Sequence, residues 1–208
     1  MKRLTIRVGG LHTIDADLPA FRPTHVIGIL DPTMPEPGGY SHLGPETDRI
    51  LLRYIDREVE REHSPLPEHV ETKLAAIERA IAALDRAPVR LFVHCHAGAS
   101  RSTATAYLAL VHRHGLGGVD AAFAELLRVT NKPWPNRRIV ALADELLGGG
   151  GRLLMPLDTY RAANPRRLEA YMRLHWRRAQ RDPAYAERLG MAEWRLPRRR
   201  IARPSVAD

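Results

Sequence analysis

The sequence predicts an α/β fold that ends in a helical, basic C-terminal extension. Three observations support this fold class. Short apolar, strand-like segments alternate with helical patterns between residues 4 and 147. A strand-to-helix passage surrounds the single cysteine of the 208 residues. Four consecutive glycines, from Gly148 to Gly151, separate this part from a segment rich in Arg, Trp and Pro.

The first half of the chain contains three candidate strands and one clear helix. Residues 4–8 alternate between apolar and polar side chains, which is the period of a strand. Residues 25–30 and 50–55 are short apolar runs and are the second and third candidates. From Glu68 to Leu84 the apolar residues fall on one helical face, and they are Val70, Leu74, Ile77, Ile81 and Leu84.

The second half begins with a buried strand and continues with helices. Residues 88–94 are apolar and β-prone, and residues 102–114 read as a helix closed by Gly115. A second helix is expected over residues 119–129. Asn131 to Asn136 forms a proline-containing turn, and we expect Asn136 to cap a third helix over residues 137–147.

The segment from His94 to Ser102, which reads His-Cys-His-Ala-Gly-Ala-Ser-Arg-Ser, joins the predicted strand to its helix. Such a turn can direct several backbone N–H groups at one point, and the helix N-terminus adds partial positive charge. Gly98 permits a backbone angle that is closed to other residues. Arg101 offers a planar fork for phosphate oxygens. The pattern predicts a phosphate-binding loop made of His96, Ala97, Gly98, Ala99, Ser100 and Arg101.

Cys95 stands at the base of this loop, six positions before Arg101. Because helix N-termini and adjacent donors stabilise a thiolate, we expect Cys95 to be a nucleophile. The thiolate would attack phosphorus and form a phosphocysteine that water then hydrolyses. Ser102 could donate a hydrogen bond to the departing sulfur. His94 is expected to support the loop through hydrogen bonds rather than to transfer protons.

The motif His-Cys-x5-Arg-Ser of residues 94–102 resembles the signature of the cysteine-dependent protein tyrosine phosphatase superfamily, particularly its small bacterial dual-specificity members. The resemblance covers roughly residues 4–150. It implies a mostly parallel central sheet flanked by helices, with residues 1–150 as the phosphatase catalytic domain. The glycines at 148–151 mark the boundary with residues 151–208, which are expected to form a basic helical extension. The implied activity is that of a protein tyrosine or dual-specificity phosphatase without a cofactor or metal.

The superfamily resemblance also implies a general acid, an Asp on a separate loop that protonates the leaving oxygen. Asp56 is the first choice, because it follows a hydrophobic strand and precedes a proline-containing loop and a helix, as in the bacterial relatives. Its alternative reading is a surface carboxylate paired with Arg53 or Arg57. His63 is the second choice. The other candidates are Asp31, Asp48 and Glu62.

The sequence disfavours a membrane-spanning protein, a secreted protein, a disulfide-linked protein and a metal-binding protein. No segment approaches 18 uninterrupted apolar residues, and the N-terminus lacks the apolar stretch of a secretory signal. One cysteine permits no internal disulfide and suits a reducing cytoplasm. The ten histidines show no tetrahedral ligand pattern, so no metal site is expected.

The substrate stays open at this stage. Phosphorylated protein is favoured. An RNA 5′-phosphatase and an inositol-phosphate or phosphoinositide phosphatase are the alternatives, although the loop has no lysine of the kind that would favour highly charged inositol phosphates. A phosphate-binding adaptor without turnover is disfavoured, because Cys95 and Arg101 are both present.

The C-terminal extension contributes much of the net charge of +8. Helical pieces are expected near residues 165–180 and 183–190, and we expect the last ten residues to be mobile. A basic segment with tryptophan could bind nucleic acid, an acidic lipid surface or an acidic partner. We favour a helical appendage that packs through Tyr171, Leu174 and Trp176.

Overall fold

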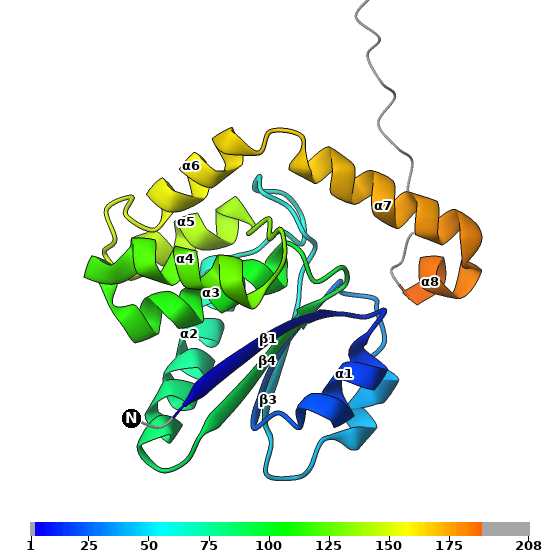
Figure 1. The fold of residues 1–208 in the computed structure, drawn as a ribbon, viewed down its shortest axis with the longest axis horizontal. Coiled ribbons are helices and arrows are strands. Elements are labelled where there is room, and N and C mark those ends of the chain that lie inside the picture. The colour runs from blue at the N-terminus through cyan, green and yellow to red at the C-terminus, as the bar shows by residue number, and fades with distance from the viewer. Residues whose placement is uncertain (1–2, 189–208) are drawn as a thin grey trace, which may run out of the picture.

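The computed structural model describes residues 3–188 and has a parallel sheet as its centre (Figure 1). Four strands lie in the order β1 (Leu4–Gly10), β4 (Val89–Cys95), β2 (His25–Leu30) and β3 (Asp48–Arg53). All three pairings are parallel. The carboxyl ends of the strands therefore meet at one edge, and Cys95 ends the strand β4 there. The α/β fold with a mostly parallel sheet is confirmed.

Helices cover both faces of the sheet. Helix α1 lies on one face, and helices α2 to α5 lie on the other (Figure 1). A third group, α6 to α8, continues from the second face and passes over the carboxyl edge. The bounds are α1 Ile14–Phe21, α2 Pro67–Ala82, α3 Arg101–His114, α4 Val119–Val129, α5 Arg137–Leu146, α6 Leu154–Ala163, α7 Arg167–Arg181 and α8 Pro183–Arg188.

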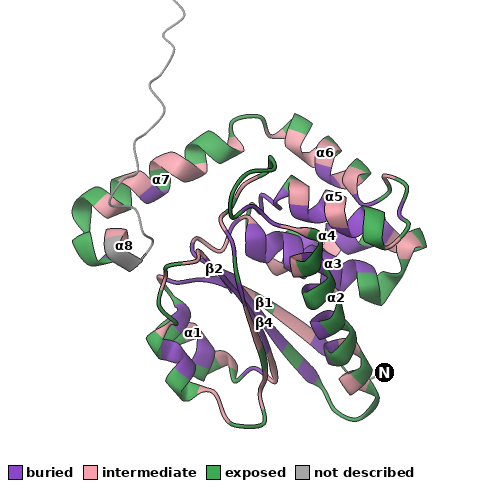
Figure 2. Cartoon of the chain, turned by 180° about the vertical axis from the view of Figure 1, so that it is seen from behind, coloured by how far each residue is buried: buried purple, intermediate pink, exposed green. Residues whose placement is uncertain are grey.

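Two hydrophobic clusters lie on opposite faces of the sheet. Because side chains alternate along a strand, Val26 and Leu30 of β2 join the cluster under α1, and Ile27 and Ile29 join the larger cluster under α2 and α3. Helix α3 is buried along most of its length (Figure 2). The element that follows the Cys95 loop is thus held rigidly against the sheet.

Most predicted elements are present, with differences at their bounds. Strand β3 covers Asp48–Arg53 rather than residues 50–55, so Asp56 is two residues further from the strand than expected. Helix α1, which is short and contains Pro19, was not expected from the sequence. It forms because Ile14 and Leu18, one turn apart, bury against the sheet.

The described part of the C-terminal extension, up to residue 188, is helical, as predicted. Leu153 and Leu157 at the start of α6 pack into the larger core. Helix α7 buries His175 and leaves Leu174 47% exposed, so the prediction that Leu174 packs the extension is wrong. Successive residues in a helix point about 100° apart, so Leu174 points away from the buried face on which His175 lies. Tyr171 and Trp176 are half-buried.

The expected mobility of the last ten residues concerns a part of the chain outside the described residues. Within residues 3–188, no helix has the length and apolar character needed to cross a membrane.

Candidate active site

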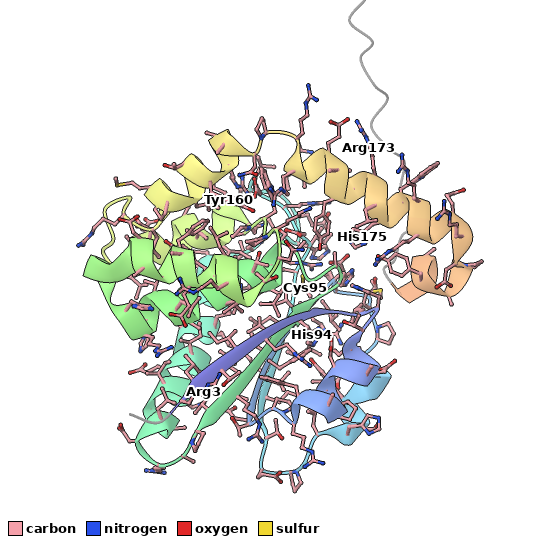
Figure 3. All side chains as sticks on the ribbon, viewed as in Figure 1. Arg3, His94, Cys95, Tyr160, Arg173 and His175 are labelled. Carbon is pink, nitrogen blue, oxygen red and sulfur yellow. The ribbon has the colours of Figure 1, made fainter. Side chains whose placement is uncertain are left out.

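The predicted phosphate loop lies between the end of β4 and the start of α3, at the carboxyl edge of the sheet (Figure 3). Gly98 has φ +73°, and a Cβ there would lie 2.8 Å from the Gly9 carbonyl oxygen. Only glycine fits both conditions. The loop is fixed from outside by backbone hydrogen bonds, from Leu11 N–H to the His96 carbonyl (2.8 Å) and from Trp134 N–H to the Ala99 carbonyl (2.9 Å).

Cys95 occupies the base of this loop and is 2% exposed. Its Sγ lies 3.2 Å from the Ser102 Oγ, in the first turn of α3. The sulfur therefore lies beside the first turn of a helix and a hydroxyl group.

Arg101 is almost fully buried and carries its charge into the site. One guanidinium nitrogen donates to Asp31 Oδ1 and to the Tyr54 carbonyl, both at 2.6 Å. Burial acts against the charge, but Cys95, Asp56 and Asp31 outweigh it, and the pKa of Arg101 is raised. A fixed cation next to the sulfur suits the binding of a phosphate group.

The histidines on either side of Cys95 serve the loop differently. His94 Nε2 lies 2.5 Å from the Tyr40 hydroxyl. Burial, followed by the neighbouring His96, lowers the pKa of His94 to about 3, so this ring is neutral near pH 7. His96 Nε2 accepts a hydrogen bond from the Asp31 backbone N–H at 3.1 Å. Both rings connect the loop to the end of β2 and the segment that follows it.

Asp56 lies beside the loop, on the side of Ser100. Its Oδ1 accepts hydrogen bonds from the Ser100 hydroxyl (2.8 Å) and from the Asn136 side-chain amide (2.7 Å). Its Oδ2 lies 3.9 Å from Arg101 Nε. Asn136 also caps α5, because its Oδ1 accepts from the Ile139 N–H. Asn136 therefore does more than cap the helix, which is the role expected from the sequence: its side-chain amide also contacts Asp56.

The other candidate acids lie in different surroundings. The His63 side chain is 53% exposed and has Glu62 as its ion partner. Asp48 begins β3, at the amino edge of the sheet, and pairs with Arg79. Asp31 reaches the site, but its carboxylate is engaged by Arg101. Asp56 is thus the candidate carboxylate that the structure places against the loop residue Ser100.

Lys73 of α2 was not singled out from the sequence, although it lies fully buried near the site. Its ammonium group lies 4.7 Å from the centre of the Tyr54 ring. Burial, followed by the charge of Arg101, lowers the pKa of Lys73 to about 7. A signal did exist: Lys73 stands three residues after Val70 and four before Ile77, on the face predicted to be buried.

Lys73→Met is expected to stabilise the protein at pH 7 by about 1–3 kcal/mol, after the lost contact with the Tyr54 ring is allowed for. The pKa of Lys73 is lower in the folded chain, so the unfolded chain binds the proton more tightly. The native free energy of unfolding therefore rises with pH between about 7 and 10.5. The stability gain of Lys73→Met over the native protein should therefore become smaller as the pH rises from about 7 to 10.5.

Urea unfolding at several pH values measures this difference. A variant that is less stable than the native protein at pH 7 would contradict the prediction. It would mean that Asp56 and Cys95 stabilise the charged form of Lys73 more than burial destabilises it.

Helix α7 passes over the same edge of the sheet, where His175 faces the end of β4 that carries His94 and Cys95 (Figure 3). The Tyr171 hydroxyl donates to the Ala97 carbonyl at 3.4 Å. His175 is 3% exposed and packs between the Tyr171 and Tyr185 rings. The extension therefore contacts the Cys95 loop directly and forms part of its surroundings.

Comparison with known proteins identifies solved structures that have a similar fold. No protein-family model and no curated protein matches the chain. Among solved structures, human DUSP28 is similar at 20% identity and a TM-score of 0.51, over 69% of this chain and 88% of that one. PTPMT1 in complex with PI(5)P is similar at 13% identity and a TM-score of 0.51, over 69% and 90% of the two chains.

A third similar structure is the human tyrosine phosphatase-like serine/threonine/tyrosine-interacting protein. It has 20% identity and a TM-score of 0.51, and the match covers 69% of this chain and 91% of that one. At these identities the likenesses concern the fold. The chain therefore has the fold of the cysteine-dependent protein tyrosine phosphatase superfamily, as the loop motif predicts.

Proposed function

We propose that this protein is a phosphomonoester hydrolase that acts through a phosphocysteine intermediate. One observation carries the proposal: the loop that holds the Cys95 sulfur and the Arg101 guanidinium meets the Asp56 carboxylate, which comes from a second loop. Cys95 Sγ lies 3.2 Å from Ser102 Oγ, and Asp56 Oδ2 lies 3.9 Å from Arg101 Nε. This set supplies a nucleophile, a phosphate-binding cation and a proton donor.

The first step transfers the phosphoryl group to sulfur. The Cys95 thiolate attacks phosphorus, the bond to the leaving oxygen breaks, and protonated Asp56 gives its proton to that oxygen. The Arg101 fork turns from Asp31 to the phosphate oxygens, and the backbone N–H groups of residues 96–101 bind the rest of the charge.

The second step hydrolyses the intermediate. Asp56, now a carboxylate, takes a proton from water, and the resulting nucleophile attacks phosphorus. The phosphorus–sulfur bond breaks, phosphate leaves, and the Ser102 hydroxyl donates a hydrogen bond to the returning thiolate. Thiolate and protonated Asp56 are both restored, so the cycle needs no cofactor or metal.

The favoured substrate is a phosphorylated protein, with phosphotyrosine or both phosphotyrosine and phosphoserine or phosphothreonine as targets. The alternative substrates are RNA 5′-phosphates and inositol phosphates or phosphoinositides. The similar structure of PTPMT1 holds PI(5)P, which supports phosphoinositides as an alternative substrate. The absence of lysine from residues 95–101 favours the less highly charged phosphoprotein.

The basic extension offers a further contact for an acidic partner or nucleic acid. Arg166, Arg177 and Arg178 of the α7 region are exposed.

Hydrolysis of para-nitrophenyl phosphate at pH 5.5–7 by purified protein tests the proposed activity, and a kcat of about 0.1–10 s⁻¹ is expected. Phosphopeptides, 5′-phosphorylated RNA and inositol phosphates, compared by kcat/KM, then separate the substrate classes. Absence of hydrolysis of every compound, together with retained phosphate binding, would favour a binding adaptor instead.

A further inference from the structure

Arg161, in the last turn of α6, lies where three segments around the proposed acid meet. Helix α6 packs on α4 and α5, and its Tyr160 is marked in Figure 3. The Arg161 guanidinium makes a two-pronged contact with the Glu58 carboxylate, in which one N···O distance is 2.9 Å. It also donates to the Pro135 carbonyl at 2.7 Å. Its side chain is only 15% exposed.

Two contacts of Arg161 lead to Asp56 by a short path, and a third leads to the Cys95 loop. Glu58 is two residues after Asp56 on the same loop. Pro135 precedes Asn136, whose amide donates to Asp56. The guanidinium also lies 4.7 Å from the Trp134 ring centre, and the Trp134 N–H donates to the Ala99 carbonyl of the Cys95 loop.

The loop that carries Asp56 has little regular structure to fix it. No helix or strand covers residues 54–66. Its internal bonds include Ile55 N–H to the His63 carbonyl and the Arg57 side chain to the Glu62 carbonyl. Such a loop takes its position from side chains that reach it from packed elements. Arg161 is an anchor of this kind, from a helix that packs its Leu157 into the core.

The charges at the anchor favour a persistent ion pair. Burial acts against ionisation of Glu58, but hydrogen bonds from the Arg161 side chain and the Arg137 backbone outweigh it and lower the pKa of Glu58. The Arg137 N–H donates to Glu58 Oε1 at 2.8 Å. A bidentate arginine also fixes orientation, which a flexible lysine would not.

We propose that Arg161 is a positioning residue for the proton donor, so that α6 of the C-terminal extension belongs to the catalytic apparatus. The inference rests on the proposed function, with Asp56 as the acid. Arg161 fixes the Glu58 end of the loop and the Pro135–Asn136 turn at once. These two segments determine where the Asp56 carboxylate points.

The test compares Arg161→Gln and Arg161→Lys with the native protein on two aryl phosphates. We expect kcat for phenyl phosphate, whose leaving group needs a proton, to fall about 10- to 100-fold in Arg161→Gln. With 2,4-dinitrophenyl phosphate, which has a good leaving group, kcat should change less than about threefold. Arg161→Lys should keep the positive charge but recover only part of the loss.

Two further variants serve as partner and control. Glu58→Gln should reproduce the leaving-group dependence of Arg161→Gln, and the double variant should be no worse than either single one. Arg167→Gln is the matched control, because Arg167 also lies over a ring and bonds to Asn164, without touching the Asp56 loop. Its two kcat values should match those of the native protein.

A readout without catalysis uses limited trypsin cleavage after Arg57 and Arg61. Arg161→Gln should expose these sites several-fold faster than Arg167→Gln does. An equal loss of kcat on both aryl phosphates, or unchanged cleavage at both sites, would overturn the positioning role. If Asp56→Asn itself shows no leaving-group dependence, the acid assignment fails instead, and faster cleavage in Arg161→Gln would still show that Arg161 anchors the loop.

Discussion

Cys95→Ser is expected to abolish hydrolysis of para-nitrophenyl phosphate, with a loss of at least about 10⁴-fold in kcat. Serine keeps the size and position of the side chain at the end of β4, but its hydroxyl stays protonated near pH 7 and is a far weaker nucleophile. The Arg101 guanidinium and the loop N–H groups are untouched. Phosphate binding, measured by calorimetry, should therefore change less than about tenfold.

The single thiol gives this prediction a second measurement. Cys95 is the only cysteine of the chain, so one equivalent of iodoacetamide can label only this residue. Inorganic phosphate should slow both labelling and the parallel loss of activity. Retained turnover in Cys95→Ser, or labelling that leaves activity intact, would remove Cys95 from the role of nucleophile.

The parts of the site that the sequence predicted are those that lie close together in the chain. The Cys95 loop needs one strand end, one glycine and one helix start, all within residues 94–102, and the structure contains these three in that order. Asp56 is distant from this loop in the chain, and only the order of elements in a similar family predicts its role. The structure places it against Ser100 even though β3 ends earlier than expected.

The parts that the sequence did not predict depend on contacts between distant segments. Tyr40 reaches His94 across 54 positions, and Arg161 reaches Glu58 across 103. No local pattern marks either residue, because an exposed-looking arginine or tyrosine in a polar stretch has many possible partners. Lys73 differs: its position on an apolar helical face was visible, but lysine is rarely fully buried and so is easily passed over.

Asp56→Asn is expected to lower kcat for phenyl phosphate about 10²- to 10³-fold and to leave 2,4-dinitrophenyl phosphate nearly unchanged. The amide keeps an oxygen that can accept from Ser100 and Asn136, so the loop should hold its place. The amide has no acidic proton to give, and only the good leaving group departs without one. The decline of kcat at higher pH, where a general acid loses its proton, should flatten.

Asp31→Asn is the matched control for that result. Asp31 also reaches Arg101, at 2.6 Å, but acts on the cation that holds the phosphate. Its loss should therefore lower kcat/KM to a similar extent for both aryl phosphates and leave the shape of the kcat profile intact. A leaving-group dependence seen in Asp31→Asn and missing in Asp56→Asn would make Asp31 the acid. If neither variant shows it, His63→Ala becomes the variant to measure; the His63 side chain is 53% exposed and lies 3.4 Å from Glu62.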